Sequence, residues 1–87
     1  MTREEVRDAV LKVLMTIAPE ADPATLNGKV SLRDQLDVDS MDLLNFAIGI
    51  HKKFRIEIPE ADYEKLATLD GCIDFVLAAT PVPSGAP

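Results

Sequence analysis

Apolar residues recur along this chain at intervals of three and four positions, the spacing that places side chains on one face of an α-helix. The first such stretch runs from about Arg3 to Ala18, with charged residues on its other faces. Pro19 follows it and disfavours helical backbone at the preceding residue, so the helix is predicted to end there. Its apolar face consists of Val6, Val10, Val13, Leu14 and Ile17.

A second helix is predicted from about Ser40 to Phe54 and is the most apolar of the chain. Its stripe consists of Leu44, Ala47, Ile50 and Phe54, widened by Met41 and Phe46. Pro59 breaks the pattern, after which Glu60 to Leu66 can form a short third helix. A fourth helix follows Thr68, whose hydroxyl suits an N-cap. The apolar face of the fourth helix consists of Leu69, Cys72, Ile73, Val76 and Leu77.

The connection from Pro19 to Asp39 is long for a compact domain, so it is expected to be anchored. Its apolar points are Leu26, Val30, Leu32 and Leu36. Ser31 and Asp34 have the spacing of a capped helical turn. Residues Arg55 to Ile58 alternate briefly as a strand would, but no partner strand is present. We therefore predict an all-α fold, a four-helix bundle with a long first loop and a short third helix.

Length, charge and cysteine content limit the number of domains, the class of partner and the compartment. At 87 residues we expect one domain, residues 1–79, with a disordered tail over residues 80–87. A net charge of −6 argues against DNA or RNA as a partner and excludes a small DNA-binding helical domain. A single cysteine fits a reducing compartment, and no stretch has the pattern of a signal peptide or a membrane span. A cytoplasmic monomer is the expectation.

Ser40 lies where the long loop enters the second helix. With Asp39 as N-cap, Asp42 occupies N3, and Val38 and Leu43 have the spacing of a hydrophobic staple. Ser40 then falls at N1, where a side chain usually faces solvent. A phosphodiester attached there would lie near unpaired helix amides, which favour anions. Taken alone, these four residues favour an ordinary helix start over an attachment site, because they are common helix caps.

The rest of the chain adds a resemblance. From about Arg3 to Ala79 it resembles the acyl carrier protein family, whose pattern is a long first loop, Asp-Ser-Leu-Asp, an amphipathic helix, Phe-Gly-Ile-x-Ile-Pro, an acidic third helix and a Thr-opened final helix. The corresponding segments here are Asp39-Ser40-Met41-Asp42, Leu43 to Lys53, Phe54 to Pro59, Glu60 to Leu66, and Thr68 to Val76.

The resemblance implies that a phosphopantetheinyl transferase attaches 4′-phosphopantetheine to Ser40, with Asp39, Met41 and Asp42 as the motif that it recognises. The thiol of that arm would carry fatty acyl, polyketide or aminoacyl groups as thioesters to acyl-loading and acyl-modifying enzymes. The domain itself would catalyse nothing. The volume available to an acyl chain would depend on the packing of Phe46, Ile48, Ile50 and Leu66.

The second helix departs from the family, in which several acids meet basic partner enzymes. Between Ser40 and Phe54 the only acid is Asp42, against Lys52 and Lys53, so the segment is net +1. We infer a specialised carrier that serves dedicated enzymes; the alternative is that the two lysines are a solvated helix end that complements the dipole. Candidate partner-contact residues are Met41, Asn45, Ile48, Lys52, Lys53 and Asp62. Arg55 replaces a usual glycine and is expected to change the end of the helix.

Other residues suggest no further site. An EF-hand counted from Asp37 would need glycine at Asp42 and glutamate at Ile48, so no metal is predicted. His51 is interpreted as a surface residue, Cys72 as an inert packed thiol, and Tyr63 as a packing residue of the third helix. The main alternative function is an unmodified helical interaction module that retains the carrier fold.

Overall fold

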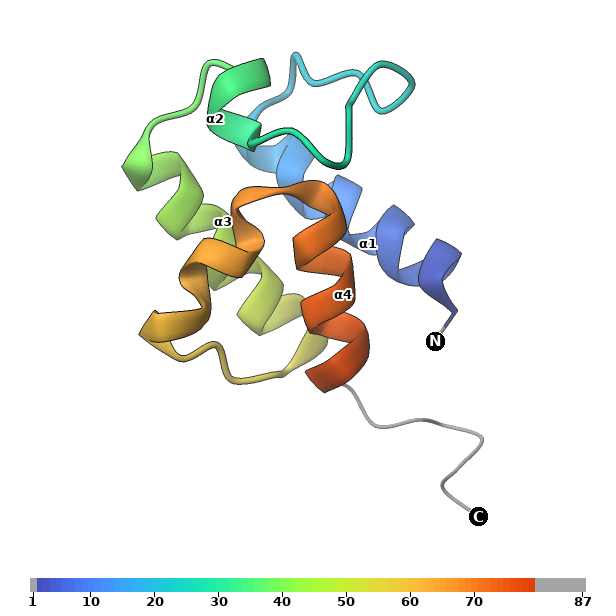
Figure 1. Cartoon of the computed structure of the whole chain (residues 1–87), viewed down its shortest axis with the longest axis vertical. Coiled ribbons are helices and arrows are strands. Elements are labelled where there is room, and N and C mark those ends of the chain that lie inside the picture. The colour runs from blue at the N-terminus through green and yellow to red at the C-terminus, as the bar shows by residue number, and fades with distance from the viewer. Residues whose placement is uncertain (1, 80–87) are drawn as a thin grey trace.

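The computed structural model describes residues 2–79 as a set of helices (Figure 1). The elements are α1 (Arg3–Ile17), α2 (Leu32–Gln35), α3 (Ser40–Phe54), the 3₁₀ helix η1 (Glu60–Ala67) and α4 (Leu69–Ala79). The only β-type pairing within these residues is an isolated bridge between Ser31 and Thr68. The predicted all-α fold is confirmed. The tail predicted over residues 80–87 lies outside the described residues.

The long helices begin and end close to the predicted positions because their caps are local. Thr2 and Glu5 form a reciprocal capping box at the start of α1, with the Thr2 amide 2.8 Å from Glu5 Oε1. Helix α1 ends one residue earlier than predicted, with Ala18 as its C-cap. The bounds of α3 agree with the prediction. The Gly71 amide donates to the Thr68 hydroxyl at 3.0 Å, as expected of an N-cap for α4.

The core lies between α1, α3 and α4, with η1 packed against α4. Most of its side chains are those predicted from the helical stripes, and large members with almost no exposure are Val6, Val10, Leu14, Phe46, Ile50, Ile73 and Val76. Burying each such side chain stabilises the fold by about 1.5–3 kcal/mol. Met41 and Leu44, predicted on the stripe of α3, are instead 62% and 37% exposed, whereas Leu11, which was not predicted, is only 6% exposed. Figure 1 shows the long connection and α2 covering one end of the three long helices.

The connection is anchored, but not at every predicted point. Leu32 is fully buried, and Leu26 and Leu36 pack against the core. Val30, in contrast, is 37% exposed, so its prediction as an anchor is wrong. It ends a surface turn in which its amide donates to the Asn27 carbonyl, and its own carbonyl accepts from Gln35 Nε2 at 2.9 Å. Polar bonds therefore replace apolar burial at this position.

Two short helices differ in detail from the sequence prediction. The expected capped turn at Ser31 is a four-residue helix, in which the Ser31 hydroxyl accepts from the Arg33 amide and the Ser31 carbonyl from the Asp34 amide. The third helix is of the 3₁₀ type and extends to Ala67. Pro59 provides no side-chain cap; instead the Asp62 amide donates to its carbonyl at 2.8 Å, the i to i+3 pattern of a 3₁₀ turn.

Arg55 ends α3 in the left-handed conformation, at φ 55° and ψ 45°. Glycine usually takes this conformation after a helix because it has no Cβ. The expectation that arginine would change the helix end is therefore wrong: the backbone keeps the glycine-like geometry. Nδ1 of His51 hydrogen-bonds to the Ile56 carbonyl just beyond the turn, a contact that helps to hold it.

Within residues 2–79, no helix is both long enough and apolar enough to cross a membrane.

Candidate functional site

The start of α3 is held by a reciprocal capping box. Asp39 has extended backbone, and its Oδ1 accepts from the Asp42 amide at 2.9 Å. Asp42 Oδ2 accepts in turn from the Asp39 amide at 3.2 Å. The prediction of Asp39 as N-cap is confirmed, and the return bond makes the helix start more rigid than a single cap would. Both carboxylates are thereby occupied in fixing the backbone.

Ser40 is the first residue of the helix and is exposed. Within residues 2–79, no other side chain hydrogen-bonds to its hydroxyl. The amides of the first helical turn have no carbonyl partner inside the helix, and only that of Asp42 is taken up by the cap. The site therefore offers a reachable hydroxyl beside amides that favour an anion. A phosphate diester on this oxygen fits the arrangement.

An apolar groove of about 300 Å³ opens next to this hydroxyl, between α3 and η1. Arg33 and Glu64 stand among its polar lining residues, together with Ser40 itself. The apolar lining consists of Leu43, Leu44, Ala47, Leu66 and Ala67. A group attached to Ser40 can thus reach apolar surface without crossing the core.

A second groove, of about 470 Å³, continues along α3 towards Ile58 and Pro59. Ala47 and Tyr63 line both grooves, so Tyr63, interpreted from the sequence as packing on the third helix with partner contact as the alternative, lies at their junction. Of the residues expected to shape an acyl pocket, Leu66 lines the first groove and Ile48 the second, whereas Phe46 and Ile50 are buried in the core. The sequence did not show which of these four residues line a groove and which lie in the core, because all four are apolar and lie on packed helices.

The candidate partner-contact residues are only partly brought together. Met41, Asn45, Ile48 and Lys52 recur at intervals of four, three and four, so they share the outward face of α3. Met41 is 62% and Ile48 40% exposed, an apolar surface of the kind that partner proteins use. Lys53 is also exposed, and both Lys52 and Lys53 line a groove with Lys12 on the α1 side. Asp62 lies on η1, half-buried, with its carboxylate 3.0 Å from Lys65 Nζ.

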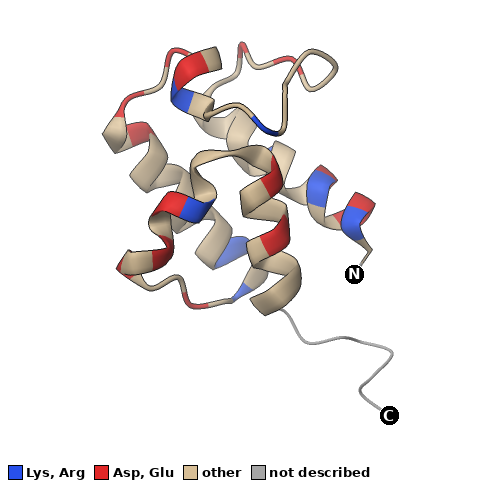
Figure 2. Ribbon diagram, viewed as in Figure 1, with Lys and Arg blue, Asp and Glu red and all other residues tan. Residues whose placement is uncertain are grey.

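Acidic and basic residues are concentrated on different helices (Figure 2). Acidic residues lie along η1 and α4, whereas the last turn of α3 carries His51, Lys52 and Lys53. Cys72 is fully buried, and burial raises the pKa of its thiol to about 12. It is therefore an inert packing residue, as predicted. His51 is exposed, as predicted, although its hydrogen bond to Ile56 was not foreseen.

No set of three or more His, Cys, Asp or Glu side chains in residues 2–79 is grouped so that it could hold a metal ion. The four aspartates from Asp34 to Asp42 thus do not assemble into a site among the described residues.

Residues 4–76 match the model of a protein family described as "phosphopantetheine attachment site". The chain belongs to the acyl carrier protein family. Two relatives are acyl carrier proteins that it resembles over most of their length. That of Campylobacter hominis is 33% identical over 73 residues, 84% of this chain and 86% of the relative. That of Campylobacter concisus is 27% identical over 73 residues, 84% of this chain and 88% of the relative.

The mitochondrial acyl carrier protein 2 of Arabidopsis thaliana is 28% identical over 76 residues, and this chain spans 60% of its length. An acyl carrier protein is a carrier and not an enzyme: it holds a covalently attached 4′-phosphopantetheine and meets acyl-handling enzymes and their acyl chains. The exposed hydroxyl at the start of α3 is compatible with covalent attachment of this group, and the apolar groove beside it is compatible with contact with an acyl chain.

Proposed function

We propose that residues 1–79 form an acyl carrier domain that bears 4′-phosphopantetheine on Ser40. It presents acyl groups as thioesters to enzymes of fatty acid, polyketide or related biosynthesis. The observation that supports this most directly is the exposure of Ser40 at the first position of a capped helix, inside the segment that matches the phosphopantetheine family. Ser31, in contrast, is used as the cap of α2.

The residues around Ser40 have different roles in this proposal. Asp39 and Asp42 hold the helix start, so they fix the backbone from which the hydroxyl extends. The first-turn amides receive the phosphodiester, and Met41, 62% exposed, gives the transferase an apolar contact. Because both neighbouring carboxylates are occupied in the cap, the base that takes the serine proton comes from the phosphopantetheinyl transferase.

The groove beside Ser40 gives an apolar acyl chain partial shelter from water. Each methylene that is removed from water there contributes about 0.8 kcal/mol. Leu44, Leu66 and Tyr63 line the path from Ser40 into the groove, so they set how much of the chain is covered.

Partner enzymes are proposed to dock on the outward face of α3, through Met41, Asn45, Ile48 and Lys52, with Lys53 and Asp62 at its margins. Because this helix is net +1, we infer dedicated partners rather than the general fatty acid elongation enzymes. A monomer in the cytoplasm is the proposed form. Because two relatives are described as mitochondrial, a mitochondrial location is the alternative to test.

The deciding experiment is intact mass spectrometry after coexpression with a broad-specificity phosphopantetheinyl transferase. The parent protein should gain the mass of one phosphopantetheine, and Ser40→Ala should gain none. Ser31→Ala is the matched control and should be modified like the parent. A parent that stays unmodified would instead support an interaction module that keeps the carrier fold.

A further inference from the structure

A third groove lies on another side of α3, where this helix packs against α1. It is a shallow, open depression of about 410 Å³ lined by Lys12, Val13, Thr16, Gly49, Lys52 and Lys53. Three of these six residues are lysines, and none is acidic. Neither Ser40 nor any residue of the groove beside it contributes to this lining. We call it the lysine groove.

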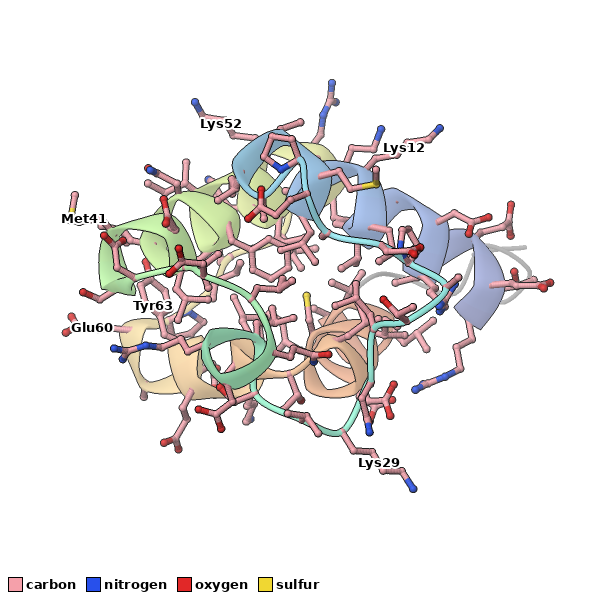
Figure 3. All side chains as sticks on the ribbon, turned by 90° about the horizontal axis from the view of Figure 1, so that it is seen from above. Lys12, Lys29, Met41, Lys52, Glu60 and Tyr63 are labelled. Carbon is pink, nitrogen blue, oxygen red and sulfur yellow. The ribbon has the colours of Figure 1, made fainter. Side chains whose placement is uncertain are left out.

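The three lysines are concentrated and lack internal partners. All three are exposed, and none has a carboxylate within 4.0 Å among residues 2–79, where the ion pairs are made by Arg3 and Lys65. They represent three of the nine Lys and Arg residues of a chain whose net charge is −6. Figure 3 shows Lys12 and Lys52 extending outward on the same side of the molecule. Like charges gathered in this way repel each other and attract an anion.

The residues that form the floor of the groove, Val13, Thr16 and Gly49, are small and uncharged. A Cβ at Gly49 would lie 2.6 Å from Val13 Cγ1, so glycine lets the backbone of α3 approach α1 closely. The Thr16 hydroxyl donates to the Val13 carbonyl at 2.6 Å, which commits its hydrogen inside the helix. The ammonium groups are therefore the only charged donors that the lining offers to a ligand.

We propose that the lysine groove binds an extended acidic segment of a partner protein. Its carboxylates meet Lys12, Lys52 and Lys53, and its backbone lies over the floor at Gly49. A nucleic acid or an anionic membrane is a poorer match, because an extended polyanionic surface would also face the acidic remainder of the chain. A membrane would further require large apolar side chains to insert, whereas Val13, half-buried, is the largest apolar residue of the lining.

This interaction goes beyond acyl carriage and does not involve Ser40. Lys52 follows Ser40 by about twelve residues, which is roughly 18 Å along the helix axis. A partner held at the lysine groove therefore leaves Ser40 and its apolar groove open. The groove would tether the carrier to a protein whose surface is acidic, and it shares Lys52 and Lys53 with the far end of the face proposed for partner enzymes.

The test uses a fluorescein-labelled peptide of ten glutamates and measures its fluorescence anisotropy as the protein is added at low salt. The triple variant Lys12→Gln, Lys52→Gln and Lys53→Gln should bind about tenfold more weakly than the parent. The matched control, with Arg7→Gln, Lys29→Gln and Lys65→Gln, loses the same charge elsewhere and should stay within about twofold. Equal losses in the two variants, or no binding by the parent, would overturn the proposal.

Three further measurements locate the site and separate it from other functions. Amide chemical shifts on adding the peptide should change at residues 12–16 and 49–53, and changes confined to other segments would contradict the lysine groove. Ser40→Ala should bind the peptide like the parent, even if phosphopantetheine attachment fails. Binding to vesicles that contain phosphatidylglycerol, without binding to the peptide, would assign the groove to membranes and overturn the protein-segment proposal.

Discussion

The two ends of α3 are built differently although they belong to one helix. At its start, a reciprocal hydrogen-bonded box between Asp39 and Asp42 fixes the backbone and leaves Ser40 exposed. At its end, three basic or titratable residues precede a left-handed Arg55, and the turn is bonded through His51. The first end is a fixed frame that suits the proposed covalent attachment, whereas the second is a cluster of positive charge that suits non-covalent docking.

The comparison teaches that attachment and recognition can be separated along one helix. The groove next to Ser40 faces η1, whereas the lysine groove faces α1. Changes at one end should therefore affect modification, and changes at the other should affect partner choice. The following substitutions test that separation.

The largest effect is expected from Asp39→Ala. It removes the side-chain acceptor of the Asp42 amide and should lower the free energy of unfolding by about 1 kcal/mol. It should also slow phosphopantetheine transfer, because the backbone that presents the serine is no longer fixed. Urea denaturation measures the first effect, and time-resolved intact mass spectrometry with purified transferase measures the second.

Thr2→Ala is the matched control, because Thr2 forms the equivalent capping box at α1. It should cost a similar free energy of unfolding while leaving the rate of modification unchanged. If the two variants were modified equally slowly, the effect of Asp39 would be one of general stability, and its role in presenting Ser40 would be refuted.

An effect of comparable size, but on one reaction only, is expected from Lys52→Glu with Lys53→Glu at the other end. The double variant restores acidic charge to the docking helix and should be loaded about fivefold faster by a malonyl transferase of general fatty acid synthesis, about 1 kcal/mol in barrier height. The measurement is malonyl transfer to the modified protein. Arg7→Glu with Lys29→Glu makes the same change in net charge away from α3 and should be loaded like the parent. If the first variant were loaded no faster than the parent, the charge of α3 would no longer support dedicated partners.

The sequence predicted α3 and its serine well because the signals are local. Asp39, Asp42 and the apolar stripe lie within one stretch, and Pro59 follows its end. It could not predict the exposed Val30, whose burial depends on where the surface turn and the Gln35 side chain meet. Nor could it predict the lysine groove, because Lys12 and Lys52 are forty residues apart in sequence and only the packing of α1 on α3 joins them.

The smallest effect is expected from Arg55→Gly, at the left-handed position that ends α3. Arginine at φ 55° is sterically strained, and glycine would relieve that strain. Glycine, however, loses more backbone freedom on folding than arginine does. The balance should raise the free energy of unfolding by about 0.5 kcal/mol, a gain of the size seen when a residue suits its native backbone angles. Urea denaturation measures it, with Arg33→Gly inside α2 as the opposite case, because glycine there should lower stability by about 1 kcal/mol. A loss of stability in Arg55→Gly would mean that the arginine side chain holds this turn through its own contacts, so that both ends of α3 would depend on side chains to fix the backbone.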